Sequence, residues 1–123
     1  MKKVILILAI LTVSLGFSQS QKGGRYKVMD RYKVTYNNAD YDVLFEFYSS
    51  YSKEKASLST FKAKRKQLQK DLGDINTMTL IESKRNKWRY KAFFKRAKNV
   101  AYIINVSFNS EDQIDSLDIN KEL

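Results

Sequence analysis

Residues 75–108, INTMTLIESKRNKWRYKAFFKRAKNVAYIINVSF, decide the fold. Apolar and polar residues alternate through much of this stretch, which is the pattern of β-strands with one buried face. Strands are predicted over residues 75–85, 87–96 and 100–108, and the third is apolar enough to lie in the centre of a sheet. One face of the second strand carries Trp88, Tyr90, Ala92 and Phe94. The other face carries Lys87, Arg89, Lys91, Phe93 and Lys95.

The sequence on either side of this stretch completes one domain. Residues 109–112 predict a turn, and residues 113–120 predict a fourth strand. Before Gly73 the apolar spacing is that of helices, which are expected over residues 26–36, from residue 39 or 40 to Tyr51, and from Ser57 or Ser59 to Leu72. Three helices followed by a four-stranded antiparallel meander predict an α+β domain with its helices packed on one sheet face.

The first 18 residues have the three parts of a secretory signal peptide. A positively charged start, MKK, precedes an apolar run over residues 4–15, and small residues follow at Gly16 and Ser18. This run is shorter than the roughly 20 apolar residues of a membrane-spanning helix. We therefore expect cleavage after Ser18, or next after Ser20, and an exported periplasmic or extracellular protein without a membrane anchor. The expected organisation is a signal peptide over 1–18, a disordered linker over 19–25, a single domain over 26–120 and a polar tail over 121–123.

The composition excludes several kinds of functional site. The chain contains neither Cys nor His, so it has no disulfide, no thiolate metal ligand and no histidine base. Residues 111–118 are acidic but lack the glycine and the ligand spacing of a calcium loop. We expect no metal site, no cofactor and no catalytic residue. The formal net charge is +10, and eight basic residues without an acidic one fall within Lys84–Lys98.

Four short motifs occur in a familiar order: NNADYDVL over residues 37–44, SLSTFK over 57–62, LGDI over 72–75 and IDSL over 114–117. In this order the chain resembles small secreted bacterial domains of unknown function in the nuclear-transport-factor-2-like superfamily. The resemblance covers about Val28 to Ile119. It implies a cone-shaped α+β fold in which a curved antiparallel sheet wraps the helices around a cavity. The family's final turn usually contains a glycine, whereas this chain has NSED.

Two surfaces are candidates for binding. Aromatic residues could line the cavity that the resemblance implies, or could simply fill the core; they are Tyr32, Phe45, Tyr48, Phe61, Trp88, Tyr90, Phe94 and Tyr102. The basic sheet face is the second candidate, formed by Lys87, Arg89, Lys91, Phe93 and Lys95. Nucleic acid is disfavoured as a partner, because Trp88 and Tyr90 fall on the face opposite the lysines and cannot stack on bases there.

The expected function is a non-catalytic, exported binding or protein-interaction domain. Its partner would be a protein or a small apolar ligand, and a homodimer through the sheet is a further alternative. Some members of the superfamily are enzymes with a carboxylate or histidine base in the cone. Only Asp30 and Glu82 could serve as such a base here, and a small cavity enzyme is therefore one alternative function. Electrostatic binding to an anionic envelope polymer is the other.

Overall fold

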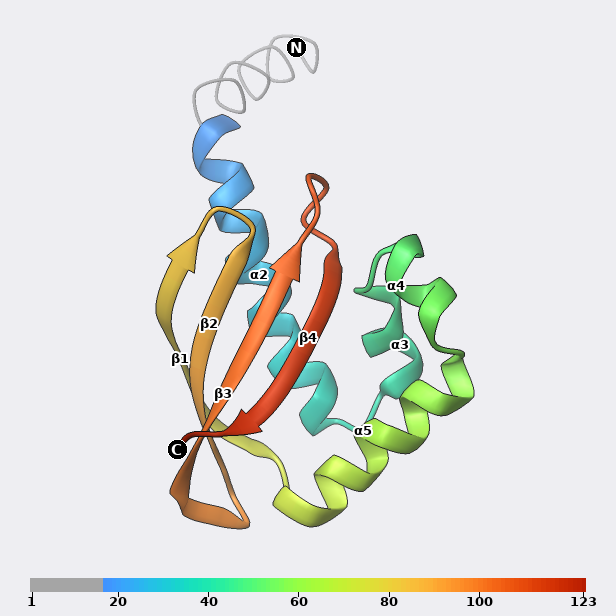
Figure 1. Cartoon of the computed structure of the whole chain (residues 1–123), viewed down its shortest axis with the longest axis vertical. Coiled ribbons are helices and arrows are strands. Elements are labelled where there is room, and N and C mark those ends of the chain that lie inside the picture. The colour runs from blue at the N-terminus through green and yellow to red at the C-terminus, as the bar shows by residue number, and fades with distance from the viewer. Residues whose placement is uncertain (1–16) are drawn as a thin grey trace, which may run out of the picture.

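The structure is a computed structural model that describes residues 17–123. Helices precede a four-stranded antiparallel sheet, so the predicted α+β class is confirmed (Figure 1). The described helices are α2 (Phe17–Asn37), α3 (Tyr41–Glu46), α4 (Ser50–Lys55) and α5 (Leu58–Leu72). The strands are β1 (Ile75–Lys84), β2 (Lys87–Phe94), β3 (Ala97–Phe108) and β4 (Ile114–Lys121).

The sheet is a meander in which neighbouring strands are also neighbours in the sequence. Its order is β1-β2-β3-β4, and every pairing is antiparallel. The long helix α2 lies behind the twisted strands, and α3, α4 and α5 continue beyond β4 (Figure 1). Helix α2 therefore covers the inner face, α3, α4 and α5 lie to the side of the sheet past β4, and the outer face of the sheet is left open to solvent.

Aromatic side chains dominate the core between α2 and the sheet. Tyr32 and Tyr36 from α2 are fully buried, as is Phe94 from β2. The Phe94 ring lies 6.3 Å from the Tyr36 ring and 5.4 Å from the Tyr102 ring, both in edge-on geometry. Such edge-on pairs add to the free energy that the rings gain by burial. The alternation of β2 thus separates a buried aromatic face from an exposed basic one.

Local capping explains where the helices begin and end. The Ser57 side chain accepts a hydrogen bond from the backbone N–H of Thr60 at 3.2 Å, which makes Ser57 the N-cap of α5. Gly73 follows α5 with a φ of 82°. Asn37 joins the end of α2 to β1, because its side chain donates to the carbonyl of Ile75 at 3.0 Å and accepts from the Ile75 N–H at 2.8 Å.

The second predicted helix is divided in two. Between α3 and α4 the backbone N–H of Ser49 donates to the carbonyl of Ile114, and the N–H of Ile114 donates to the carbonyl of Phe47. This short pairing with the start of β4 interrupts the helix, and the Ser49 side chain then caps α4 by accepting from the Ser52 N–H. Tyr51, expected on the buried face, is consequently exposed.

The chain ends differ from the prediction as well. Helix α2 includes residues 19–25, where a disordered linker was expected. The predicted tail also begins later, since Lys121 pairs with Tyr102 at the end of β4 and the N–H of Glu122 donates to the carbonyl of Ala101. Residues 1–16 of the expected signal peptide lie outside the described residues.

Candidate functional site

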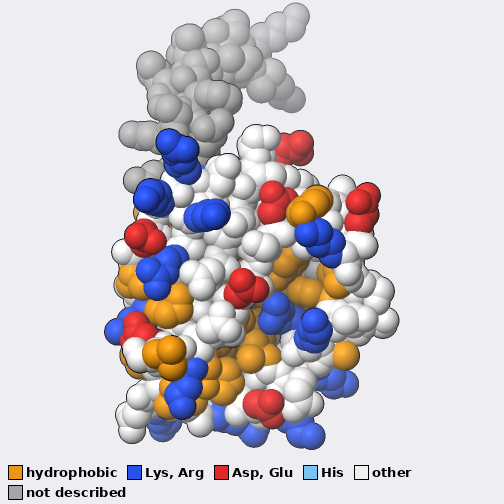
Figure 2. All heavy atoms as spheres, viewed as in Figure 1, with side chains coloured by type: hydrophobic (Ala, Val, Ile, Leu, Met, Phe, Trp, Pro, Cys, Tyr) orange, Lys and Arg blue, Asp and Glu red, His pale blue; other side chains and the backbone are white. Residues whose placement is uncertain are grey.

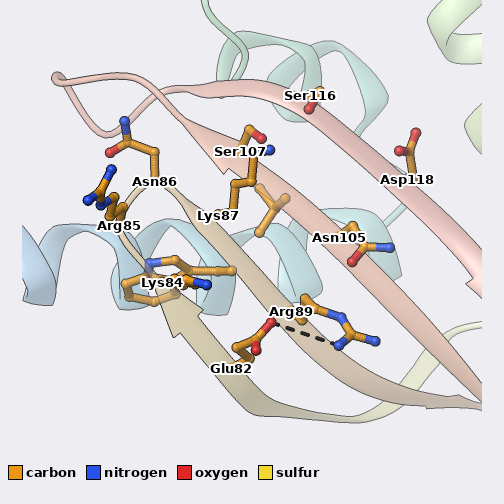
Figure 3. Close-up of a pocket in the computed structure, with 12 residues that line it drawn as sticks. Glu82, Lys84, Arg85, Asn86, Lys87, Arg89, Asn105, Ser107, Ser116 and Asp118 are labelled. Atoms are coloured by element: carbon orange, nitrogen blue, oxygen red, sulfur yellow. Dashed lines mark ion pairs between the residues drawn. The ribbon is translucent and has the colours of Figure 1, made fainter.

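A groove of about 710 Å³ lies on the outer face of the sheet, at the end where β1 turns into β2 (Figure 3). All four strands contribute to it, and most of its side chains are polar or charged. The groove is lined by Glu82, Lys84, Arg85, Asn86, Lys87, Trp88, Arg89, Asn105, Val106, Ser107, Ser116 and Asp118. It is open to solvent along one side and therefore suits an extended segment better than a compact small molecule.

The strand register builds this groove from two rows of side chains. Lys87 of β2 pairs with Ser107 of β3, which pairs with Ser116 of β4. The next outward-facing row begins at Arg89, which pairs with Asn105, and Asn105 in turn pairs with Asp118. Paired residues on one sheet face have neighbouring side chains. Each row therefore begins with a cation on β2 and continues with hydrogen-bonding groups on β3 and β4.

Four cations and two carboxylates give the groove a positive balance. Lys84, Arg85, Lys87 and Arg89 supply the positive charges. Arg89 forms an ion pair with Glu82 at 3.8 Å, drawn as the dashed line in Figure 3, and both side chains are about half exposed. Exposed pairs of this kind contribute little free energy, typically about 0–1 kcal/mol. The Arg89 guanidinium can therefore exchange Glu82 for an anionic group of a partner at small cost.

Arg25 of α2 fixes the end of the sheet next to the groove. Its guanidinium donates to Asp112 at 2.9 Å, to the carbonyl of Arg85 at 2.9 Å and to the Asn86 side chain at 3.0 Å. The turn between β1 and β2 and the turn between β3 and β4 are thus held by one side chain. We refer to this arrangement as the Arg25 clasp.

The clasp also explains two unusual backbone conformations. Arg85 has a φ of 55° and Asp112 a φ of 61°, values that favour glycine. Asp112 lies in the turn between β3 and β4, and its carboxylate accepts the hydrogen bond of Arg25. A hydrogen-bonded side chain thus helps to hold a conformation that is otherwise costly. Sequence reasoning missed Arg25, because 87 residues separate it from Asp112.

The predicted basic face contributes only two of its five residues to the groove. Lys87 and Arg89 line it. Lys91 lies farther along β2, where it pairs with Glu122 at 3.4 Å. Phe93 pairs with Thr77 on the same outer face, and Lys95 follows the end of β2 in the turn to β3. The polar residues of β3, Asn105 and Ser107, could have been found from their alternation within the otherwise apolar third strand.

The aromatic residues predicted for a cavity are packed against one another. Tyr32, Tyr48, Phe61, Trp88, Tyr90 and Phe94 are buried in the core cluster, and Phe45 and Tyr102 pack against it partly buried. Tyr48 and Phe61 illustrate the packing, since their rings lie edge-on at 5.1 Å. These rings therefore form the core, which was the alternative to lining a cavity. Only Trp88 also borders the outer groove.

A buried polar cluster interrupts this core between α2 and α5. The Tyr32 and Tyr48 hydroxyl groups are hydrogen-bonded to each other at 3.1 Å. The Arg65 guanidinium lies 5.5 Å from the centre of the Phe61 ring, and its Nε is buried without a hydrogen-bond partner. Burial works against the charged guanidinium, but Tyr32 and Tyr48 outweigh that effect and raise the pKa of Arg65. Arg65 is therefore a cation on the buried side of α5.

The two carboxylates considered as bases do not share a site. Asp30 is exposed on α2, and Glu82 is exposed on the outer sheet face beside Arg89. Within residues 17–123, no group of three or more acidic, histidine or cysteine residues could hold a metal ion. No helix in that part of the chain is both long and apolar enough to cross a membrane.

Comparison of the chain with protein-family models, with curated proteins and with solved structures finds no match.

Proposed function

We propose that the chain is an exported, non-catalytic interaction domain that binds an acidic protein segment in the groove on the outer sheet face. The groove geometry carries this proposal. Its four cations lie along the end of β1 and the start of β2, while Asn105, Ser107 and Ser116 offer hydrogen bonds beside them. An extended segment with alternating carboxylates could pair with the cations and use its backbone for hydrogen bonds to the polar rows.

The buried position of the aromatic rings favours an acidic protein segment over nucleic acid. Trp88 and Tyr90 are only 3% and 4% exposed, and both belong to the core cluster. Single-stranded nucleic acid is bound through rings on which its bases stack, and the groove offers no such exposed ring among its lining residues. What the groove offers is charge and hydrogen bonds, which an acidic peptide satisfies. The predicted signal peptide over residues 1–18 supports the export that we propose. The order of the four motifs supports membership of the nuclear-transport-factor-2-like superfamily, which is also part of the proposal.

A peptide-binding measurement tests the proposal. The probe is a fluorescein-labelled peptide of alternating Glu and Ser, and its affinity is measured by fluorescence anisotropy at low and at physiological salt. The double variant K87Q/R89Q removes two cations of the groove. The control is the double variant K64Q/K66Q, which removes two exposed cations of α5 and therefore has the same net charge as K87Q/R89Q.

We expect K87Q/R89Q to weaken binding by about tenfold or more, and K64Q/K66Q to weaken it by less than about threefold. Trp88 is the only tryptophan, and its fluorescence should change when the peptide occupies the groove. If both variants lose the same affinity for the peptide, the overall charge of the protein accounts for the binding, and the proposal is overturned. Tighter, groove-dependent binding of dextran sulfate than of the peptide would show that the partner class is wrong.

A further inference from the structure

Strand β1 forms an edge of the sheet that the described part of the chain leaves uncovered. Within residues 17–123 its only strand neighbour is β2, and Figure 1 shows no described helix or strand beyond it. An edge strand presents backbone N–H and C=O groups that can pair with a further strand. Most residues of β1 are exposed, among them Ile81 at 47%. The edge of β1 is therefore a surface to which another strand can be added.

The opposite edge of the sheet, β4, is protected in two ways. At its start, Tyr48 forms a parallel bridge with Ile114. Farther along the strand, Asp118 and Lys121 supply charged side chains. Pairing and charge are common means by which proteins protect a sheet edge. The free edge of β1 has neither over residues 75–81, INTMTLI, in the part of the chain that the structure describes.

The middle of β1 is regular and partly apolar. Register shifts against β2 lie on either side of residues 77–80, so these four residues form the regular part of the strand. Met78 and Leu80 pack partly buried against the core, whereas Thr77 and Thr79 are exposed. Figure 2 shows hydrophobic side chains, with acidic and basic ones among them, along this side of the molecule. A strand added here would cover the exposed parts of the two apolar side chains.

One side of α2 lies along the same edge. At the end of α2, Asn37 is hydrogen-bonded to the backbone of Ile75 at the start of β1. Two turns earlier, Asp30 lies near enough to Tyr90 of β2 to help raise the pKa of that hydroxyl. Lys33 lies between Asp30 and Asn37 on the same side of the helix, because residues three or four apart are neighbours there. Helix α2 thus places one acidic and one basic side chain beside β1.

The charges on this side are complementary to those of a second copy. The net charge of +10 makes two copies repel each other in most orientations. Antiparallel pairing of β1 with β1 of a second copy relates the two by a twofold axis, which we place at Thr79. Asp30 of each copy then faces Lys33 of the other. Lys84 at the end of one β1 comes level with Asp74 at the start of the other. Opposite charges meet at both places, which favours a second copy over a purely acidic or purely basic partner.

We propose that two copies of the protein associate through β1 and join their sheets into one continuous antiparallel sheet. Because Thr79 lies on the twofold axis, Met78 of each copy stands opposite Leu80 of the other, and Thr77 stands opposite Ile81. The apolar side chains of the edge are then covered by their own counterparts. This association does not depend on the peptide-binding function of the outer groove.

Analytical ultracentrifugation of the purified chain measures the association. We expect a monomer–dimer equilibrium with a dissociation constant on the order of 10–100 μM, because a strand edge is smaller than a standard interface. Ile81→Lys adds a charge at the edge and should weaken the dimer by about tenfold or more. Leu58→Lys is the matched control, since Leu58 is an exposed aliphatic residue of α5 on the far side of the molecule (Figure 1). It should weaken the dimer by less than about threefold.

A protein that remains monomeric up to about 1 mM overturns the proposal. Equal losses in Ile81→Lys and Leu58→Lys overturn it as well, because overall charge would then account for the association.

Charge exchange on α2 separates specific pairing from overall charge. Lys33→Glu lowers the net charge and would strengthen an association that depends on overall charge alone. We expect the opposite, a weakening of about fivefold, because the new carboxylate faces Asp30 of the other copy. Asp30→Lys should weaken the dimer by a similar factor. The double variant D30K/K33E should recover the natural affinity to within about threefold, since both copies carry the exchange. Stronger association of Lys33→Glu, or no recovery in the double variant, contradicts the proposed arrangement.

Single cysteines locate the twofold axis. The chain has no cysteine of its own, and Thr77 and Thr79 are both exposed. The thiols of T79C would lie opposite each other in the dimer, within the distance that a disulfide bridges. Those of T77C would be offset by about 13 Å along the strands. Under mild oxidation T79C should form a covalent dimer, seen by non-reducing electrophoresis, and T77C should remain mostly monomeric. Equal cross-linking of the two variants, or more in T77C, overturns the proposed register.

Discussion

The two faces of the sheet come from the same strands and have opposite properties. Phe93 and Phe94 are adjacent in β2, and yet Phe94 is fully buried against α2 whereas Phe93 lies half-buried on the outer face beside Lys91. The inner face is packed with rings and the outer face carries a charged groove. The difference shows how one alternating strand can supply both the core and a binding surface.

The two phenylalanines offer the most direct test of this division. We expect Phe94→Ala to lower the free energy of unfolding by about 3–5 kcal/mol, because it removes a buried ring and leaves a cavity. Phe93→Ala should cost only about 1 kcal/mol, since the ring is partly exposed already. Urea denaturation of both variants measures the two values. Similar losses in the two variants would mean that both faces of β2 contribute equally to stability.

The Arg25 clasp joins the helical layer to the groove end of the sheet, so its loss should affect both. Arg25→Ala removes several charge-assisted hydrogen bonds and should lower the free energy of unfolding by about 2–3 kcal/mol. Hydrogen exchange should become faster in the two turns that the clasp holds, over residues 85–86 and 109–112. Lys27→Ala, an exposed residue of the same helix, is the matched control.

A second variant tests the clasp from the opposite side. A Cβ atom at Gly24 would lie 2.6 Å from the Asp112 carboxylate, so Gly24→Ala must displace that side chain. It should therefore reproduce part of the faster exchange in residues 109–112. Unchanged exchange in both Arg25→Ala and Gly24→Ala would show that the turns hold their shape without the clasp.

Substitution of two buried tyrosines tests the inner face further, with a smaller expected change in the free energy of unfolding. The Tyr90 hydroxyl is buried without a hydrogen-bond partner, whereas that of Tyr36 donates to the carbonyl of Gly73 at 3.2 Å. Tyr90→Phe should therefore raise the free energy of unfolding by about 1 kcal/mol, and Tyr36→Phe should lower it by about as much. Thermal and urea unfolding of both variants would measure this difference, and effects of the same sign would contradict it.

The same tyrosines give the stability a pH dependence. Burial, then the charges of neighbouring groups, raises the pKa of Tyr36 and of Tyr90 well above the ordinary value of 10.0. The unfolded chain therefore releases these protons at a lower pH than the folded chain does. Their contribution to stability is complete below about pH 10 and is lost as the pH rises toward the folded pKa, by about 1.4 kcal/mol per pH unit for each tyrosine. Tyr90→Phe should remove the contribution of one tyrosine, about 1.4 kcal/mol per pH unit, from the slope of the free energy of unfolding against pH.

Local sequence patterns predicted most of the fold because they follow from the geometry of the chain itself. The period of two placed Trp88 and Phe94 on the buried face of β2, and Ser57 and Gly73 marked the ends of α5. The prediction of one helix reaching Tyr51 was wrong, because the interruption comes from a pairing between Ser49 and Ile114. No local pattern around residue 49 indicates that its backbone will pair with a residue 65 positions farther along the chain.

The sequence by itself determined the α+β class, the two-faced second strand and the absence of cysteine and histidine chemistry. Tertiary structure decided where the groove lies, since the register brings Asn105 and Ser107 beside Arg89 and Lys87. It also decided that Arg25 holds two turns and that Arg65 meets the tyrosine pair. The physical reason is that periodicity tells which face of an element a residue occupies, whereas its neighbours across the fold depend on strand register, turns and helix packing.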